Sequence, residues 1–176
     1  KINRAKEKNN ANPLAFMIKA LSETLKEFPI FNSSLIENDQ IVLKKYINIG
    51  IAVDTKEGLV VPVIQDADKL SLEEISAKVK ELAEKARNKK LMNTNLEKRT
   101  ITISSLGKLG GIGFTPIINP PDVAIISMSK TYKRLVLAEE LDIMPIAMSY
   151  DHRVINGADA GRFMVFLKGI LDNFND

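Results

Sequence analysis

The chain has 176 residues, of which 45% are hydrophobic and 27% are charged, as expected for a single globular domain. It contains no cysteine, which excludes disulfides, thiolate metal sites and cysteine nucleophiles and favours a reducing compartment. The net charge of +3 is small and the lysines are dispersed, so nucleic-acid binding is not predicted. No apolar run approaches the roughly eighteen residues that a membrane span needs, and no export signal follows the first residues.

The first third of the chain predicts a helix followed by strands. Apolar residues recur at helical spacing over 13–28, with Asn12 placed to cap the helix and Pro13 suited to its first turn. Alternating apolar residues then predict a strand over 41–53. A turn is expected at 55–58, with a return strand over 59–64 that its proline would confine to a sheet edge.

The remainder predicts two more helices separated by strands. Ser71 and Glu74 form a capping box for a helix over 72–89. Further apolar segments predict strands at 100–104, 123–128, 134–138 and 143–149, with a glycine-rich loop at 107–113. A final helix over 158–174 is expected to bury Phe163, Phe166, Leu167, Ile170, Leu171 and Phe174. Three helices and about six strands, several of them consecutive, favour a mixed α/β or α+β sandwich over a doubly wound sheet.

His152 is the only histidine. A lone histidine is more often structural than catalytic, but this one follows an apolar strand and precedes a helix. Such a junction exposes a side chain while rigid elements hold it. A neutral imidazole accepts a proton near pH 7, because the unperturbed pKa of histidine is about 6.5. From the residue alone, both interpretations remain open.

Two further positions carry weaker signals. Asn156 precedes a glycine, which favours a turn, and it suits the N-cap of the final helix; alternatively, its side chain braces the loop that holds His152. Ser104 ends a strand beside loop glycines, where a hydroxyl could donate to an oxyanion, although a polar strand end is the simpler interpretation. No phosphate-binding loop or nucleophile elbow is present, and one histidine without a carboxylate cluster predicts no metal site.

The segment 149–158, SYDHRVINGA, resembles the D-H-R-x-x-[DN]-G signature of the dihydrolipoamide acyltransferases, the core subunits of 2-oxo acid dehydrogenase complexes. Other segments follow the family pattern in the same order, namely 31–35, 49–64, 83–87, 101–111, 116–121 and 123–125. The resemblance extends from about Pro13 to Phe174. It is greatest to the acetyl-transferring branch of pyruvate dehydrogenase complexes, on the segment 103–107 and on Asn156.

The resemblance implies a chloramphenicol-acetyltransferase-like two-layer sandwich, with a mixed sheet packed by helices. It also implies a homotrimer, with active sites in channels between subunits, that assembles to a 24-mer cage in full-length members. Coenzyme A enters a channel as a substrate, and the lipoyl group comes from a lipoyl domain outside this chain, so no covalent cofactor is expected. The implied partners are the 2-oxo acid decarboxylase and dihydrolipoamide dehydrogenase subunits. The implied location is the bacterial cytoplasm, or the mitochondrial matrix in a eukaryote.

The family's site residues transfer onto this sequence by motif. His152 would be the base, and Ser104 of the neighbouring subunit would donate to the oxyanion. Asn156 would orient His152, but as an amide it cannot supply the negative charge that the aspartate of many relatives has, which excludes a charge relay. Substrate binding is assigned to Ser105, Gly107 and Asp54.

The resemblance also implies that 1–176 is one catalytic domain without its first strand and helix, its C-terminal tail, or the lipoyl and subunit-binding domains. Alternatives remain: a succinyl- or branched-chain-transferring relative, or a non-catalytic scaffold paralogue, which loss of His152 would betray. An antibiotic acetylase is a further alternative. A peptide-synthetase condensation domain would need a second histidine where Asp151 stands. A binding module would leave the ordered series of matches unexplained.

Overall fold

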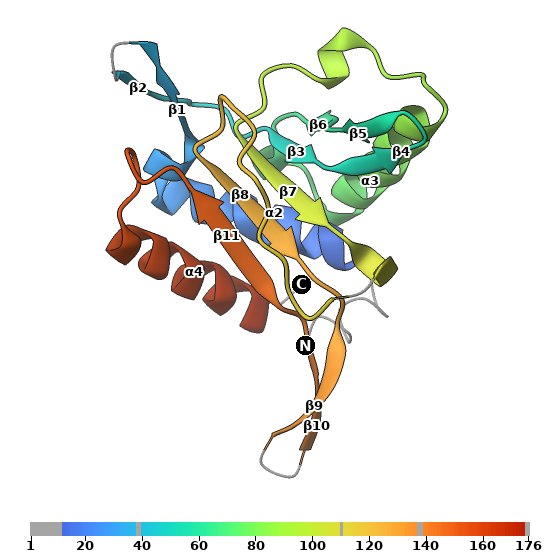
Figure 1. Ribbon diagram of the computed structural model, residues 1–176, viewed down its shortest axis with the longest axis vertical. Coiled ribbons are helices and arrows are strands. Elements are labelled where there is room, and N and C mark those ends of the chain that lie inside the picture. The colour runs from blue at the N-terminus through green and yellow to red at the C-terminus, as the bar shows by residue number, and fades with distance from the viewer. Residues whose placement is uncertain (1–11, 38–39, 110, 137–138, 175–176) are drawn as a thin grey trace.

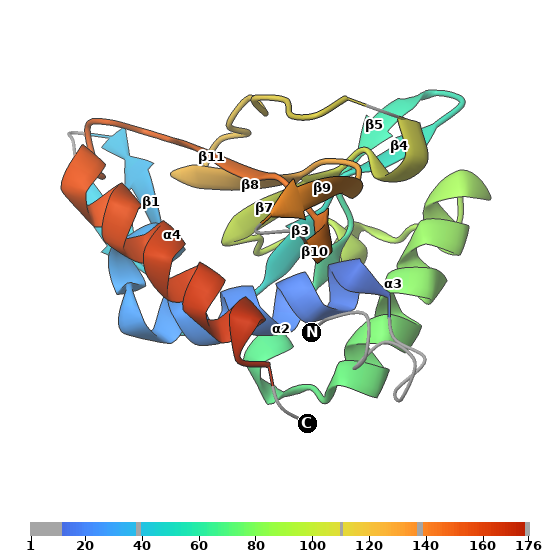
Figure 2. The same cartoon turned by 90° about the horizontal axis from the view of Figure 1, so that it is seen from below.

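The computed structural model describes residues 12–37, 40–109, 111–136 and 139–174, and a mixed five-stranded sheet runs through it. In spatial order the strands are β11 (Ile146–Tyr150), β8 (Ala124–Met128), β7 (Ile101–Ser105), β3 (Ile49–Ile51) and β6 (Val63–Ile64). β7 is parallel to both of its neighbours, whereas the outer strands β11 and β6 are antiparallel to theirs. The central strands are buried on both faces, because helices cover one face and an irregular segment crosses the other (Figure 2).

The helical layer consists of α2 (Pro13–Glu27), α3 (Leu72–Arg87) and α4 (Gly157–Asp172). All three lie on the same face of the sheet, with α2 between the other two (Figures 1 and 2). Short 3-10 helices connect the elements at Pro29–Asn32, Ala67–Lys69, Asn93–Asn95 and Gly107–Leu109. None of the helices in the described part has the length and apolar character needed to cross a membrane.

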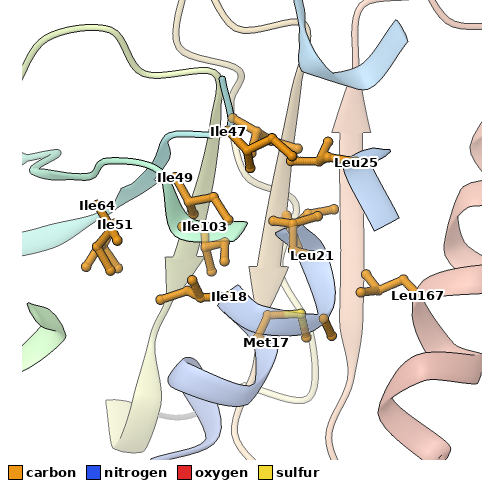
Figure 3. Close-up of a cluster of buried hydrophobic side chains, with 14 of the residues drawn as sticks. Met17, Ile18, Leu21, Leu25, Ile47, Ile49, Ile51, Ile64, Ile103 and Leu167 are labelled. Atoms are coloured by element: carbon orange, nitrogen blue, oxygen red, sulfur yellow. The ribbon is translucent and has the colours of Figure 1, made fainter. Parts of the chain in front are cut away.

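The main core forms where α2 packs on the sheet. Met17, Ile18 and Leu21 of α2 are fully buried and lie against the isoleucines of β3 and β7 (Figure 3). Leu167 reaches the same cluster from α4. The Asn12 side chain accepts a hydrogen bond from the Ala15 N–H at 2.8 Å, which starts α2 where the sequence predicts.

Three hairpins extend from this body: β1 (Ser33–Ile36) with β2 (Gln40–Leu43), β4 (Val53–Thr55) with β5 (Gly58–Val60), and β9 (Tyr132–Val136) with β10 (Glu139–Ile143). The β9–β10 hairpin projects furthest from the sheet (Figure 1). Gly58 closes the β4–β5 turn with a φ of 117°, a conformation that favours glycine.

The fold class is confirmed, and so are the helix positions to within one or two residues. The capping box is also confirmed, since the Ser71 hydroxyl accepts from the Glu74 N–H while the Glu74 carboxylate accepts from the Ser71 N–H. The predicted Asn156 cap of α4 is present as well.

Several boundaries predicted for the strands are wrong. The segment 41–53 is divided among β2, β3 and β4, and the return strand 59–64 is interrupted at Pro62, which has no N–H to donate. The strand expected over 143–149 begins only at Ile146, after β10, which the sequence analysis missed. The described residues therefore form eleven short strands rather than about six. Phe166, expected inside, is 39% exposed.

Candidate active site

His152 lies exposed in the turn that joins β11 to α4. The turn starts where the Asp151 N–H donates to the Val123 carbonyl at 2.8 Å. It closes where the N–H groups of Val154 and Ile155 both donate to the Asp151 carbonyl at 3.0 Å. The backbone on either side of the imidazole is therefore fixed, as predicted for a strand–helix junction.

The side chains next to His152 order the same turn. Asp151 Oδ1 accepts from Arg153 Nε at 3.0 Å, and Oδ2 accepts from Arg153 Nη2 at 2.7 Å. These hydrogen bonds hold the pKa of Asp151 below its usual range. The Tyr150 ring lies beside the imidazole, with ring centroids 5.7 Å apart and planes inclined by 41°. The imidazole thus has an aromatic neighbour, and the carboxylate before it is engaged by arginine.

Asn156 occupies the N-cap of α4. Its Oδ1 accepts from the Asp159 N–H at 2.9 Å, and its amide donates to the Asp159 carboxylate. Both interactions point at the start of the helix, which confirms the capping interpretation. The predicted bracing of His152 would therefore act through the turn and remains a prediction.

Ser104 and Ser105 end β7, and both are half-buried. Ser104 is paired with Ser127 of β8 in the sheet register. Gly107 begins the loop that follows, with a φ of 52° that suits glycine. The two hydroxyl groups therefore lie at the end of β7, directly before the exposed residues Leu106 and Gly107.

Asp54 is exposed in β4, directly after β3. β3 and β7 are parallel, with Ile51 opposite Ile103, and the Ala52 N–H donates to the Ile103 carbonyl at 2.9 Å. Asp54 and Ser105 therefore leave the sheet at the same end. The structure brings the predicted substrate-binding residues to one end of the sheet.

The two predicted catalytic centres lie at opposite ends of the sheet. Ser104 is in register with Ala147 of β11 through Ser127, whereas His152 lies beyond Tyr150, the last residue of β11. Three residues along a strand span about 10 Å and two strand spacings about 9.6 Å, which separates Ser104 from Tyr150 by about 14 Å. Figure 1 shows β7 and β11 ending on opposite sides. Within one chain, the structure does not bring His152 and Ser104 together.

Asp122 is a buried polar group that was not predicted from the sequence, and the next residue, Val123, accepts the hydrogen bond from the Asp151 N–H. Asp122 Oδ2 accepts from Arg99 Nε at 2.8 Å and from the Thr102 hydroxyl at 2.7 Å. Burial raises the pKa of the Asp122 carboxyl, and this effect exceeds the lowering by Thr102 and Arg99. An acidic residue directly before an apolar strand was the available signal. No group of three or more metal-ligating side chains is found in the described part of the chain.

The family model for the 2-oxoacid dehydrogenases acyltransferase (catalytic domain) matches residues 1–176. The dihydrolipoyllysine-residue acetyltransferase component of the Cupriavidus necator pyruvate dehydrogenase complex is 49% identical over 180 residues, covering 98% of this chain and 32% of that protein. The succinyltransferase component of the Rickettsia typhi 2-oxoglutarate dehydrogenase complex is 43% identical over 164 residues, covering 91% of this chain and 41% of that protein. The chain therefore spans less than half the length of either relative.

Solved structures from the same kind of enzyme complex are also similar to this chain. The cubic core of a pyruvate dehydrogenase multienzyme complex and the Azotobacter vinelandii dihydrolipoamide acetyltransferase each superpose with a TM-score of 0.90 at 44% identity, covering 97% of this chain and 73% of theirs. The Azotobacter structure comes from an investigation of the role of a serine, a histidine and an asparagine in the catalytic mechanism of that enzyme. Chloramphenicol acetyltransferase, at 14% identity, superposes with a TM-score of 0.69 over 96% of this chain and 82% of its own, which shows the shared fold. The chain belongs to the 2-oxoacid dehydrogenase acyltransferases and corresponds to their catalytic domain.

Proposed function

We propose that this domain moves an acetyl group between dihydrolipoamide and coenzyme A, with His152 as the base. The observation that carries the proposal is an exposed imidazole held rigidly between β11 and α4, within the signature motif of the family. In the Azotobacter enzyme, the investigated histidine and asparagine are four positions apart, as are His152 and Asn156 here.

The chemistry follows from the proton that must move. A thiol with a pKa of about 8.5 or above is mostly protonated at neutral pH, so the His152 imidazole takes its S–H proton. The thiolate attacks the thioester carbonyl of the other carrier, forming a C–S bond and an oxyanion that accepts a hydrogen bond from the Ser104 hydroxyl. Collapse breaks the original C–S bond, and the departing thiolate recovers the proton from His152. The base contributes about 10² to 10⁴ in rate and the oxyanion donor about 10² to 10³.

We further propose that each active site combines His152 of one copy with Ser104 of another, in a homotrimer. The separation of these residues within one chain supports this, since a single copy cannot bring them into contact with one substrate. The loop after β7 also carries apolar side chains open to solvent, because Leu109, Ile112 and Ile117 are 81%, 74% and 89% exposed. Such exposure favours burial against a second copy.

The carriers would approach the Ser104 end of the sheet. Ser105, Gly107 and Asp54 are assigned to substrate binding because they leave the sheet at that end. Coenzyme A is a substrate, and the lipoyl group would come from a lipoyl domain. The relatives are components of multienzyme dehydrogenase complexes. We therefore propose the decarboxylase and dihydrolipoamide dehydrogenase subunits as partners, and a 24-mer cage like the cubic core of the structural neighbour.

A succinyl-transferring enzyme is the second candidate, supported by the 43% identity to the Rickettsia succinyltransferase component. Acyl pockets discriminate weakly, because one methylene contributes only about 1–3 kcal/mol. A scaffold without turnover is disfavoured, since His152 is present and exposed.

The test is transfer from acetyl coenzyme A to free dihydrolipoamide, with succinyl coenzyme A in parallel. His152→Ala should lower kcat by about 10² to 10⁴, and Ser104→Ala by about 10² to 10³. Undiminished turnover in His152→Ala would refute the mechanism. Faster transfer from succinyl coenzyme A than from acetyl coenzyme A would show that the domain is a succinyltransferase instead.

Mixing the two inactive variants tests the shared site. If each site takes His152 from one copy and Ser104 from another, co-assembled His152→Ala and Ser104→Ala chains leave about a quarter of the sites intact. Each variant assembled alone provides the matched control. Absence of recovered activity in mixed oligomers would contradict a site built from two copies.

A further inference from the structure

A buried ion pair joins the start of β7 to the segment that precedes β8. The Arg99 and Asp122 side chains are 11% and 0% exposed, with Nε and Oδ2 2.8 Å apart. The other side of the guanidinium donates from Nη2 to the carbonyls of Asn119 and Pro120, at 3.1 and 3.2 Å. One arginine therefore holds both the carboxylate and two carbonyls of the chain leading into β8.

The surroundings of Arg99 leave it little freedom. A Cβ at Gly50 would lie 2.4 Å from the Arg99 Cδ, so the side chain crosses β3 at a point where only glycine leaves room. Lys44 Nζ donates to the Arg99 carbonyl at 3.0 Å. The Thr102 hydroxyl of β7 also donates to Asp122, at 2.7 Å. The guanidinium is thus fixed along its aliphatic stem as well as at its head.

Asp122 connects this pair to the turn of His152. The next residue, Val123, supplies the carbonyl that accepts from the Asp151 N–H at 2.8 Å. On its other side Asp122 forms an antiparallel bridge with Ser34. Residues opposed in this way have Cβ atoms about 4.5–5.5 Å apart on the same face. Ser34 Oγ and Asp122 Oδ1 are both buried without a hydrogen-bond partner among the described residues.

We propose that Arg99 and Asp122 form a positioning pair for His152. The pair sets the position of the Val123 carbonyl, that carbonyl sets Asp151, and Asp151 sets the direction of the neighbouring imidazole. The inference rests on the proposed role of His152 as the base. A positioning role differs from a purely stabilising one, because the rate of the chemical step, and not only the stability of the fold, would then depend on Arg99.

Arg99→Met removes the charge and the two carbonyl contacts. We expect kcat to fall about 10- to 100-fold with KM within about twofold, because a displaced base slows the chemical step without weakening ground-state binding. Arg99→Lys keeps the charge and should recover part of kcat. The combination of Arg99→Met, Thr102→Val and Asp122→Leu fills the site with apolar groups, which often restores stability. We expect it to fold stably while kcat stays low.

His152 offers a readout that does not depend on turnover. It is the only histidine, so ¹³C-labelled histidine yields one set of ring signals. We expect these signals to shift in Arg99→Met and in the apolar combination, and to stay unchanged in Val79→Ala. Val79 is buried in α3, away from the pair, so Val79→Ala lowers stability through lost packing alone.

Wild-type kcat and ring signals in Arg99→Met would overturn the proposal. So would an equal fall in kcat in Val79→Ala, since stability alone would then explain the loss. If the wild-type protein transfers no acetyl group, the proposed function fails. Shifted ring signals in Arg99→Met would in that case still support the positioning of His152, and unshifted signals would refute it.

Discussion

Replacing Phe163 by alanine tests how α4 is seated on the body, and with it the turn that carries His152. Phe163 is fully buried, stacks on Phe31 with centroids 4.1 Å apart, and meets Phe28 edge-on at 5.6 Å. Truncation of a buried phenylalanine costs about 3–5 kcal/mol, and each aromatic pair adds about 0.5–1.5 kcal/mol beyond its buried area. We therefore expect a loss of about 4–5 kcal/mol, a large part of the 5–15 kcal/mol by which domains are typically stable.

Urea unfolding followed by circular dichroism measures this loss, because the chain has no tryptophan to report by fluorescence. With a slope of about 2 kcal/mol per molar urea, the midpoint should fall by about 2 M, compared at equal protein concentration. Phe166→Ala is the matched control on the same helix. Phe166 is 39% exposed, and within the described part of the chain its ring meets one other aromatic ring, that of Phe28, so about 1 kcal/mol is expected. Equal midpoints for the two variants would refute the assignment of Phe163 as the anchor of α4.

Three further predictions concern stability. Asn156→Ala should cost about 0.5–2 kcal/mol by removing the cap of α4, whereas Asn156→Asp should keep it, as thermal unfolding would show; equal losses would contradict capping. Asp151 has a depressed pKa in the folded state, so it contributes stability above its unfolded pKa of about 3.9 that is lost as pH falls through the folded value. The stability difference between wild type and Arg153→Met should therefore shrink on acidification from pH 6 to pH 3, and a constant difference would argue against this linkage. Gly50→Ala should cost about 1–3 kcal/mol in urea unfolding, because its methyl group meets the Arg99 side chain, and a neutral effect would show that Arg99 moves freely.

Local patterns predicted most of the helical layer. The cap at Asn12 and the capping box of Ser71 and Glu74 involve residues three positions apart, so the sequence contains both partners. The position of His152 between a strand and a helix was likewise readable, since the period of the apolar residues changes there. The family motif added the proposed chemistry of His152, which no periodicity implies.

The strands were harder to predict because their ends depend on partners far along the chain. β10 (Glu139–Ile143) was missed because it pairs only with β9, in a hairpin outside the main sheet, and Phe166 remained partly exposed although its spacing matches the buried face of α4. In both cases the pattern of apolar residues was compatible with the structure, but it did not specify which distant segments would pack against β10 or against Phe166.

By itself, the sequence determined the helices, their caps, the class of fold and the positions that match the family motif, because these depend on contacts within a few residues or on a motif. Only the tertiary structure decided where those residues lie. Antiparallel pairing of β11 with β8 sent His152 to the end of the sheet opposite Ser104. Folding also joined Arg99 to Asp122, 23 positions away. Both results arise from pairing between distant segments, whose free energy is set by the whole core rather than by any local pattern.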